Sequence, residues 1–414
     1  MEILYISSVP SKSEFEHMKK MVKPNINLVK YGMQESSYKF HSLIQKGLIF
    51  NNENIYSLIG RPVSYMAHKK LFWKKVIEKN DNITYEHVFF LNLPIIKNII
   101  VSTSFFFKSL NWLFKNRKKD KFIIMDAAYI TVIPFAILAS KIIKCKKISI
   151  VCDIYEYMGN VNDAREKKSS FHKFVNIIMK SVYKNIDGFV FLTEAMNNVL
   201  NKNSKPYIVM EGLVDSDMIN INNDIKNKSK KDVIMYAGAI RAQYGIKNLL
   251  EAFLKYENKN AELWLYGAGD YVDDVKKISK KDHRIKYKGL LSLDKIVLEE
   301  LKATILINPR SANQEFTKYS FPSKNMEYMV SGTPVLTTKL PGMPKEYYEY
   351  VYLVEGDNEN DILDSLNKLF SLSKKELHVM GKKAKEFVLN YKNNIYQSKR
   401  IIELGKSVIS EKNT

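Results

Sequence analysis

Short apolar runs alternate with longer stretches of helical periodicity along the chain. Runs typical of buried strands occupy Ile3–Ser7, Ile83–Leu91, Phe122–Met125, Ile148–Val151, Gly188–Leu192 and Pro206–Met210. Stretches typical of helices occupy Ile95–Phe114, Tyr129–Ile143, Phe171–Tyr183 and a segment that begins at Glu194. Short apolar strands separated by helices predict a parallel sheet that is covered on both faces.

The alternation stops between residues 216 and 232, where polar and charged residues follow without a period. We predict a linker there. Beyond it, strands are expected at Val233–Tyr236, Leu263–Tyr266, Ile285–Lys288, Ile305–Asn308 and Pro334–Thr337. Helices are expected at Ile246–Tyr256, Phe321–Val330 and in the tail from Lys375. The pattern predicts an α/β protein with two Rossmann-like domains facing a cleft, and ligands at the carboxyl ends of the strands.

Charge and composition narrow the possible partners. The 414 residues carry 65 Lys and Arg against 44 Asp and Glu, a net charge of +21. Such an excess favours nucleic acid, anionic lipid or a phosphorylated substrate, although a genome rich in A and T also enriches lysine. No helix-turn-helix or aromatic-basic motif supports nucleic acid. The seven histidines lack the spacing of metal ligands, and two cysteines are too few for a cysteine zinc site, so we expect no metal. Two cysteines also exclude a disulfide scaffold, which favours the reducing cytoplasm as the compartment.

Two apolar stretches require comparison with membrane spans. Residues 95–114 are interrupted by two lysines and two asparagines, and residues 129–143 are too short and contain Pro134. A span needs about 20 mostly uncharged residues, so we expect buried or surface-lying helices. No signal peptide is evident, because Met1 is followed directly by a strand pattern.

The segment from Tyr319 to Leu336 carries the clearest chemical signal. Pro322 fits the first position of a helix, and Gly332 fits its end. Lys324 lies in the first turn, where a cation is misplaced unless an anion is bound, because the free N–H groups already make that end positive. We therefore predict a phosphate site, with Glu327 one turn later in reach of a neighbouring hydroxyl. The alternative is an ordinary capped helix with solvated charges.

This segment resembles the donor-binding segment of the family 4 retaining glycosyltransferases. The family pattern has two Glu residues eight positions apart, followed by a small-Gly-x-Pro-Val run. Glu327 matches the second Glu, which in the family contacts the nucleotide ribose, whereas Tyr319 stands at the first. The Phe-Pro-Ser-Lys-x-x-Glu-Tyr variant is similar to the branch found in bacterial surface-polysaccharide enzymes.

Further matches follow in the family's order over about residues 186–355. The segments at 236–241 and 245–253 resemble the stretch whose Arg and Lys bind the diphosphate, but those two columns hold Ala239 and Tyr244. Arg241 and Lys247 are the nearby replacements; we favour Arg241, because Lys247 suits a solvated helix charge. The Gly-x-Gly turn after Tyr266 and the strand end at Lys288 also match.

The N-terminal half matches less well. Asp153 stands where the family often has a His-Asp pair, with Cys152 in place of the His; a cap or turn role is the alternative. Glu346 matches weakly a second acidic residue near the nucleotide. The residues assigned to catalysis are Arg241, Lys324 and Asp153. Those assigned to donor binding are Gly238, Lys247, Gly267, Gly289, Leu290, Tyr319, Phe321, Ser323, Asn325 and Glu327.

The resemblance implies a fold of the GT-B type, with an acceptor domain in 1–205, a donor domain in 206–390 and a C-terminal helix in 391–414 that packs back on the first. It implies a retaining transferase that uses a UDP-hexose as its donor and needs neither a metal nor a cofactor. The expected acceptor is a polyprenyl-diphosphate-linked glycan, and a protein-linked glycan is the alternative. A non-catalytic partner subunit is the rival hypothesis.

Charge also suggests where the protein works. We expect peripheral association with the inner face of the cell membrane, since anionic lipid attracts basic segments. Two segments mix cations with aromatic residues, namely 69–75 and 105–119. The alternative is that these aromatic residues belong to the core and the lysines are solvated.

Overall fold

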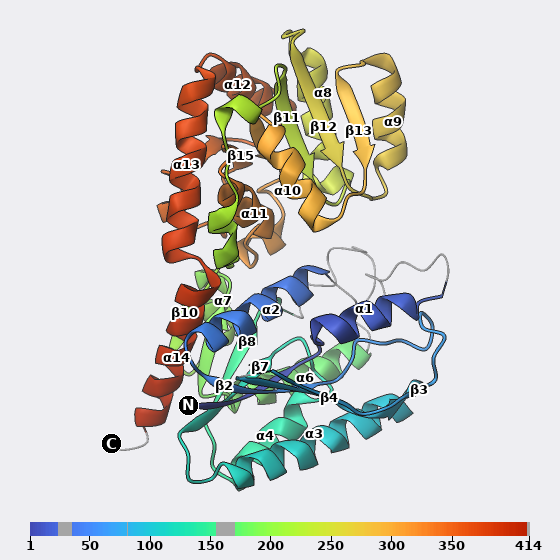
Figure 1. Cartoon of the computed structure of the whole chain (residues 1–414), viewed down its shortest axis with the longest axis vertical. Helices are drawn as coiled ribbons and strands as arrows, with labels where there is room; N and C mark the ends of the chain where they lie inside the picture. The colour runs from blue at the N-terminus through green and yellow to red at the C-terminus, as the bar shows by residue number, and fades with distance from the viewer. Residues whose placement is uncertain (24–34, 81, 155–169, 412–414) are drawn as a thin grey trace. The chain divides into compact units, whose positions relative to one another are not determined.

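The computed structural model describes residues 1–23, 35–80, 82–154 and 170–411. These form two compact units, one from Met1–Met210 with Asn394–Thr414 and one from Glu211–Asn393 (Figure 1). The chain passes between the units after Met210 and again after Asn393, a few residues later than the sequence suggested. Each unit has its own sheet and core.

The N-terminal unit is built on an eight-stranded sheet with the order β10-β9-β8-β7-β1-β2-β5-β4. All its strands pair in parallel except β4, which is antiparallel to β5 at the edge. The strands are β1 (Glu2–Ser7), β2 (Asn54–Ile59), β4 (Val76–Asn80), β5 (Ile83–His87), β7 (Lys121–Asp126), β8 (Lys147–Val151), β9 (Gly188–Phe191) and β10 (Tyr207–Val209). A separate pair joins β3 (Phe72–Trp73) to β6 (Phe90–Leu91).

Helices cover both faces of this sheet (Figure 1). They are α1 (Lys12–Lys20), α2 (Glu35–Phe50), α3 (Ile96–Lys115), α4 (Ile133–Ile142), α6 (Ser170–Lys184), α7 (Glu194–Leu200) and α14 (Asn394–Ser410). The C-terminal helix α14 packs on α2 at Gly47, where a Cβ atom would lie 2.0 Å from the carbonyl oxygen of Asn394. Only glycine allows the two helices to come this close.

Two features of this unit differ from the sequence prediction. The stretch Ile83–Leu91 is not one strand, because β5 ends at His87 and β6 belongs to the small separate sheet. The pattern also did not predict α1, α2 or β2. Buried polar side chains, among them His41 and Gln45 on α2 and Ser57 on β2, interrupt the apolar periodicity of these elements.

The C-terminal unit has a six-stranded parallel sheet with the order β13-β12-β11-β14-β15-β16. Its strands are β11 (Asp232–Ala237), β12 (Ala261–Tyr266), β13 (Ile285–Gly289), β14 (Ile305–Asn308), β15 (Val335–Thr338) and β16 (Tyr352–Val354). Its helices are α8 (Ile246–Lys255), α9 (Val272–Lys281), α10 (Leu293–Lys302), α11 (Ser323–Ser331), α12 (Glu359–Phe370) and α13 (Lys374–Tyr391). Two apolar clusters, one on each side of the sheet, form its core.

The predicted linker is part of this unit. Residues 216–232 contain the 3₁₀ turns η3 (Ser216–Asn220) and η4 (Ile225–Asn227), whose first amides are capped by Asp215 and Asp224. Asn223 is buried and donates to the carbonyl oxygen of Ser331 at 3.0 Å. The linker prediction was therefore wrong, because these polar side chains cap turns and bond to the core rather than face solvent throughout.

Candidate functional site

The strand order of the C-terminal unit defines where a ligand can bind. Counted along the chain, its strands follow the order 3-2-1-4-5-6, with the direction of winding reversed between β11 and β14. The helices that follow these two strands, α8 and α11, belong to different core clusters on opposite faces of the sheet. Doubly wound sheets bind ligands in the crevice at the carboxyl edge where the winding reverses in this way. The loops involved begin at Gly238 and at Pro309.

Helix α11 is fixed against the end of β11 by Tyr328. Its hydroxyl accepts from the amide of Ala237 at 2.8 Å and donates to the carbonyl oxygen of the same residue at 3.1 Å. The ring is fully buried. Lys324 lies one turn earlier on the same helix face, so this contact places Lys324 beside Gly238, the residue after Ala237.

Gly238 makes room for that lysine. A Cβ atom at position 238 would lie 2.2 Å from Cε and 2.7 Å from Nζ of Lys324. The ammonium group therefore lies directly against the backbone at the carboxyl end of β11. The first turn of α11 contains no acidic residue, and Ser323 at its start is exposed. Glu327 is half-buried one turn further on.

The boundaries of α11 differ slightly from the prediction. The helix begins at Ser323, so Pro322 occupies the N-cap rather than the first helical position. Its end is as expected, because Gly332 adopts a left-handed conformation with φ 78°. The free amides of the first turn thus begin at Ser323, next to Lys324.

Two further cations converge on the ring of Tyr244. The guanidinium carbon of Arg241 lies 5.8 Å from the ring centroid and that of Arg310 lies 5.5 Å from it. Arg241 belongs to the loop after β11 and Arg310 to the loop after β14. Three cations, Lys324, Arg241 and Arg310, therefore come from the elements that border the crevice.

The glycines assigned to the site shape its other wall. Gly267 has φ 136°, and a Cβ atom there would lie 1.8 Å from the carbonyl oxygen of Gly238. Its amide donates to the carbonyl oxygen of Gly289 at 2.8 Å. Gly289 has φ 77°, and the following Leu290 is 76% exposed. The structure thus brings Gly238, Gly267 and Gly289 together at the strand ends, as the pattern predicted.

Two of the assigned donor contacts lie in the core instead. Asn325 is fully buried, accepts from Asn308 at 2.8 Å and donates to Thr337 at 3.1 Å. Its side chain ties α11 to β14 and β15, so it positions the helix and does not face a ligand. Phe321 is 5% exposed and packs on Tyr347, with ring centroids 5.0 Å apart. The structure thus buries both side chains, which the sequence could not show, and their assignment to donor binding stays an untested prediction.

Other assigned residues lie at the edge of the site or outside it. Lys247 is exposed on α8, with Nζ 3.9 Å from the carboxylate of Glu251 one turn away. Tyr319 is half-buried at the end of the 3₁₀ turn η6 (Glu315–Lys318). Asp153 is exposed after β8 in the N-terminal unit. Its catalytic role stays a prediction.

Glu346 takes part in an ion pair, and its role near the nucleotide stays a prediction. Its carboxylate lies 2.7 Å from Nζ of Lys392, which also contacts Glu211 at 3.2 Å. Lys392 and Glu211 are both buried, and they lie where the chain enters and leaves the C-terminal unit. This ion pair holds the two connections together. Sequence reasoning missed it because the partners are far apart in the chain.

A buried group in the N-terminal unit was also missed. The hydroxyl of Tyr5 and Nδ1 of His41 are 2.6 Å apart, and Nε2 of His41 lies 3.4 Å from Asp126. Burial lowers the pKa of His41, although Asp126 opposes that effect. The group lies at the carboxyl end of β1 and β7, and all three side chains are buried. We therefore regard it as a structural link between α2 and the sheet.

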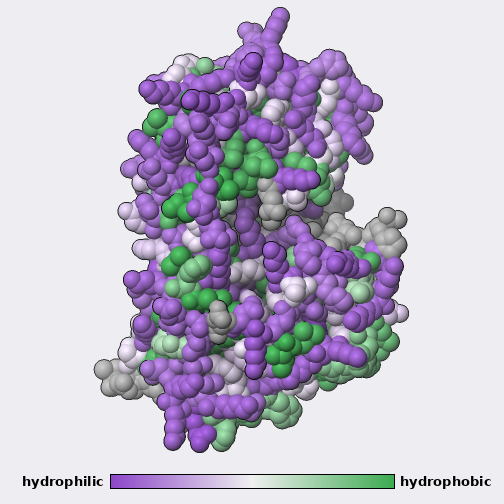
Figure 2. All heavy atoms as spheres, in the orientation of Figure 1, coloured by the Kyte–Doolittle hydropathy of each residue, from purple (hydrophilic) through white to green (hydrophobic). Residues whose placement is uncertain are grey.

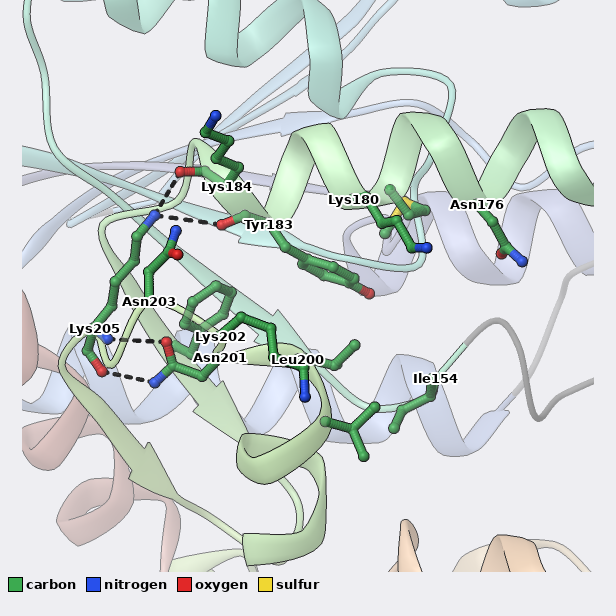
Figure 3. Close-up of a pocket in the computed structure, with 13 residues that line it drawn as sticks. Ile154, Asn176, Lys180, Tyr183, Lys184, Leu200, Asn201, Lys202, Asn203 and Lys205 are labelled. Carbon is green, nitrogen blue, oxygen red and sulfur yellow. Dashed lines mark hydrogen bonds between the residues drawn. The ribbon is translucent and has the colours of Figure 1, made fainter.

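The N-terminal unit also contains a pocket of about 440 Å³ between α6 and α7 (Figure 3). Its walls include apolar side chains of Met179, Phe189 and Leu200. Nζ of Lys205 donates to the carbonyl oxygen of Lys184 at 2.6 Å and thereby caps α6. The ammonium of Lys205 therefore bonds to the main chain, whereas Lys324, Arg241 and Arg310 form the cation cluster of the C-terminal unit.

Comparison with known proteins follows the same division of the chain. Residues 217–387 match the protein family described as Glycosyl transferases group 1. These residues form a glycosyl transferases group 1 domain. The match includes Gly238, Arg241, Arg310, Lys324 and Glu327. No curated protein sequence matches the chain.

Solved structures resemble the whole chain at low sequence identity. Sucrose-phosphate synthase (tll1590) from Thermosynechococcus elongatus is 12% identical with a TM-score of 0.67, over 99% of this chain and 100% of that one. Alr3699/HepE from Anabaena in complex with UDP is 12% identical with a TM-score of 0.63, over 98% and 100%. The lipopolysaccharide outer core galactosyltransferase WaaB is 14% identical with a TM-score of 0.61, over 98% and 99%. These likenesses confirm the predicted α/β fold with two Rossmann-like domains, the GT-B type.

Two features are absent from residues 1–23, 35–80, 82–154 and 170–411. None of the helices in these ranges combines the length and the apolar character that crossing a bilayer requires. The same residues hold no cluster of three or more His, Cys, Asp or Glu side chains that could bind a metal ion.

Proposed function

We propose that the chain is a glycosyltransferase that moves a hexose from a UDP-sugar to a saccharide acceptor. The observation that carries the proposal is the cation cluster of Lys324, Arg241 and Arg310 at the carboxyl edge of β11 and β14. Cations held at the switch point of a doubly wound sheet suit the diphosphate of a nucleotide. The group 1 glycosyltransferase domain covers all three residues.

We propose that the nucleotide of the donor is UDP. Alr3699/HepE, which shares the fold, is described in complexes with UDP, with UDP and glucose, and with UDP-glucose. In this chain we assign Glu327 to the ribose and the exposed end of β13, at Gly289 and Leu290, to the base. UDP-glucose, UDP-galactose and UDP-N-acetylglucosamine are all candidate donors, because Tyr319 replaces a carboxylate of the sugar pocket.

We propose retention of the anomeric configuration without a divalent metal. The bond between C1 of the sugar and the diphosphate oxygen breaks through an oxocarbenium-like transition state, and the acceptor oxygen bonds to C1 on the same face. The leaving phosphate oxygen takes the acceptor proton. Lys324 and Arg241 neutralise the charge that develops on the diphosphate.

A panel of nucleotide sugars tests the donor assignment. Purified protein should be stabilised against thermal unfolding by UDP and by at least one UDP-hexose, because ligands that bind the folded state raise its stability. Stabilisation by GDP or CMP sugars alone contradicts the assignment. Transfer or hydrolysis should continue in excess chelator, and an absolute requirement for Mg²⁺ contradicts the metal-free mechanism.

We propose further that the acceptor is linked to a polyprenyl diphosphate and that the protein works at the inner face of the cell membrane. The face formed by α3 and α4 supports this. On α3, Ile96, Ile99, Phe107 and Phe114 are exposed at helical spacing, Phe107 by 65%. On α4, Phe135, Leu138 and Ile142 repeat the pattern. Figure 2 shows apolar side chains along the lower edge of the molecule, where Figure 1 places these helices.

Charge around this face favours a lipid partner. Residues 92–119 and 127–152 contain no Asp or Glu, while Lys115, Arg117, Lys118, Lys141 and Lys144 are exposed. Apolar side chains bordered by cations are typical of surfaces that bind anionic membranes. Phe105 and Trp112 of the predicted patch are instead buried. In the other predicted patch, Phe72 is exposed and Trp73 is buried.

Co-sedimentation with vesicles tests the membrane proposal. The protein should bind vesicles that contain anionic lipid, and binding should fall as salt rises because charge is screened. Replacing Phe107 and Leu138 by Ser should weaken binding, whereas Ile219→Ser, at an exposed apolar residue of the other unit, should not. Equal binding to neutral vesicles, or none to either kind, contradicts the proposal and favours a soluble acceptor such as a protein-linked glycan.

The rival proposal is a non-catalytic partner subunit. The family has two cations and a carboxylate at the positions of Ala239, Tyr244 and Tyr319. Their replacement favours a protein that has lost transferase activity. The retained Lys324, Arg241 and Glu327 favour an active enzyme. No binding of UDP at millimolar concentration would decide for the partner subunit.

A further inference from the structure

The loops after β11 and β14 are locked together beside the cation cluster. Gly245 has φ 81°, and a Cβ atom there would lie 1.7 Å from the carbonyl oxygen of Pro309. The side-chain amide of Gln314 donates to the carbonyl oxygen of Gln243 at 3.2 Å. Arg310, which follows Pro309, is therefore held next to the 3₁₀ turn η5 (Ala242–Tyr244) by backbone geometry.

Arg310 lies close to two aromatic rings. Its guanidinium carbon is 4.6 Å from the ring centroid of Phe316 and 5.5 Å from that of Tyr244. Both distances are within the range of cation–π attraction, which orients a guanidinium through its plane, whereas anions bind at its edge. The same positive charge opposes the rise that burial causes in the pKa of Tyr236, so it reaches the end of β11.

Arg241 approaches the same Tyr244 ring at 5.8 Å. Two guanidinium groups around one side chain repel each other, and the ammonium of Lys324 lies against Gly238, three residues before Arg241. An anion with several oxygens that binds beside this loop is attracted by all three positive charges. The carboxylate of Asp357, which contacts the same loop as Arg310, is hydrogen-bonded to Ser311 and to Asn313.

We propose that Arg310 binds the phosphate groups of the nucleotide together with Arg241, and that Tyr244 is the platform that positions both guanidinium groups. This inference rests on the proposed function, since it names the residues that hold the diphosphate of the same donor. Tyr244 stands at a position where the family has a cation, and the proposal gives its ring the role of orienting two arginines. Arg310, in the loop after β14, supplies the positive charge that is missing at position 244.

Calorimetric binding to the full chain tests the proposal with three probes: UDP, uridine and inorganic pyrophosphate. Arg310→Gln should weaken UDP roughly tenfold or more, as expected for one charge-assisted contact, and weaken pyrophosphate similarly, while uridine binds as before. Arg310→Lys should lose less than Arg310→Gln. Tyr244→Phe should bind UDP like the wild type, and Tyr244→Leu should not. Arg117→Gln removes the same charge from the N-terminal unit and serves as the matched control.

The outcomes separate this inference from the function on which it rests. If the wild type binds UDP and Arg310→Gln binds it equally, the role of Arg310 is overturned and the donor assignment stands. If pyrophosphate binds in an Arg310-dependent way but no nucleotide does, the phosphate site stands and the donor assignment falls. If the wild type binds neither, both fall. An unchanged circular dichroism spectrum and thermal midpoint for Arg310→Gln and Arg310→Lys show that these variants remain folded.

Discussion

Removing the ammonium group of Lys324 is the perturbation for which the structure makes the clearest prediction. The side chain lies against Gly238, and Tyr328 fixes its helix to Ala237 by two hydrogen bonds. Lys324→Ala leaves both of these bonds in place and is expected to fold normally. What it removes is one cation beside the free amides of the first turn of α11.

The size of the effect follows from the kind of interaction that the substitution removes. A hydrogen bond between an ammonium and a phosphate oxygen contributes about 1.5–3 kcal/mol. Because each 1.4 kcal/mol is a factor of ten, the dissociation constant for UDP should rise roughly 10- to 150-fold. Gly238→Ala keeps the charge but displaces it, since the new Cβ atom would lie 2.2 Å from Cε of Lys324. We expect a smaller effect there, because a lysine tip can move aside.

Isothermal titration calorimetry with UDP measures these changes directly. Lys277→Ala is the matched control, because it removes an exposed lysine of the same unit, on α9, that pairs with Asp274 one turn away. Its dissociation constant should stay within about twofold of the wild type, as surface ion pairs contribute little. If Lys324→Ala and Lys277→Ala bind UDP with equal affinity, the diphosphate does not bind at the start of α11.

Three further predictions concern stability. Asn325→Ala should lower the free energy of unfolding by about 1–3 kcal/mol in denaturant titration, because it strands two buried hydrogen-bond partners; an unchanged midpoint contradicts its structural role. Lys392→Met should lower the free energy of unfolding by about 3–5 kcal/mol, because it leaves the buried Glu211 carboxylate without its cation. Glu346→Gln, at an exposed site, should lower it far less. Burial lowers the pKa of Lys228 to about 7, so between that value and about 10.4 the unfolded chain holds a proton that the folded chain lacks. Wild-type stability should therefore rise with pH over this range relative to Lys228→Met, and parallel pH profiles would show that the lysine is not buried.

The elements of the C-terminal sheet were predictable because their sequence signals are local. Short apolar runs end in glycine at Gly238, Gly267 and Gly289, and α11 is bounded by Pro322 and Gly332. A residue type at a fixed offset is enough for such predictions. The same local reasoning correctly placed Lys324 in the first turn of a helix.

What could not be predicted depends on contacts between distant residues. Asn325 and Lys324 are adjacent polar residues in the sequence, and only the packing of α11 on β14 and β15 shows which one is buried. Arg310 reaches the site because Gly245 lets two loops touch. The pairing of Glu346 with Lys392 spans 46 positions along the chain. No periodicity or spacing rule contains this information.

Release of UDP from UDP-hexoses by the purified chain, with a glycan acceptor and in the presence of chelator, is the decisive measurement of the proposed transferase activity. We expect turnover of at least one UDP-hexose by the wild type and a decrease of roughly tenfold or more in Lys324→Ala. Absence of UDP release from every UDP-hexose, or equal release by the two proteins, would contradict it.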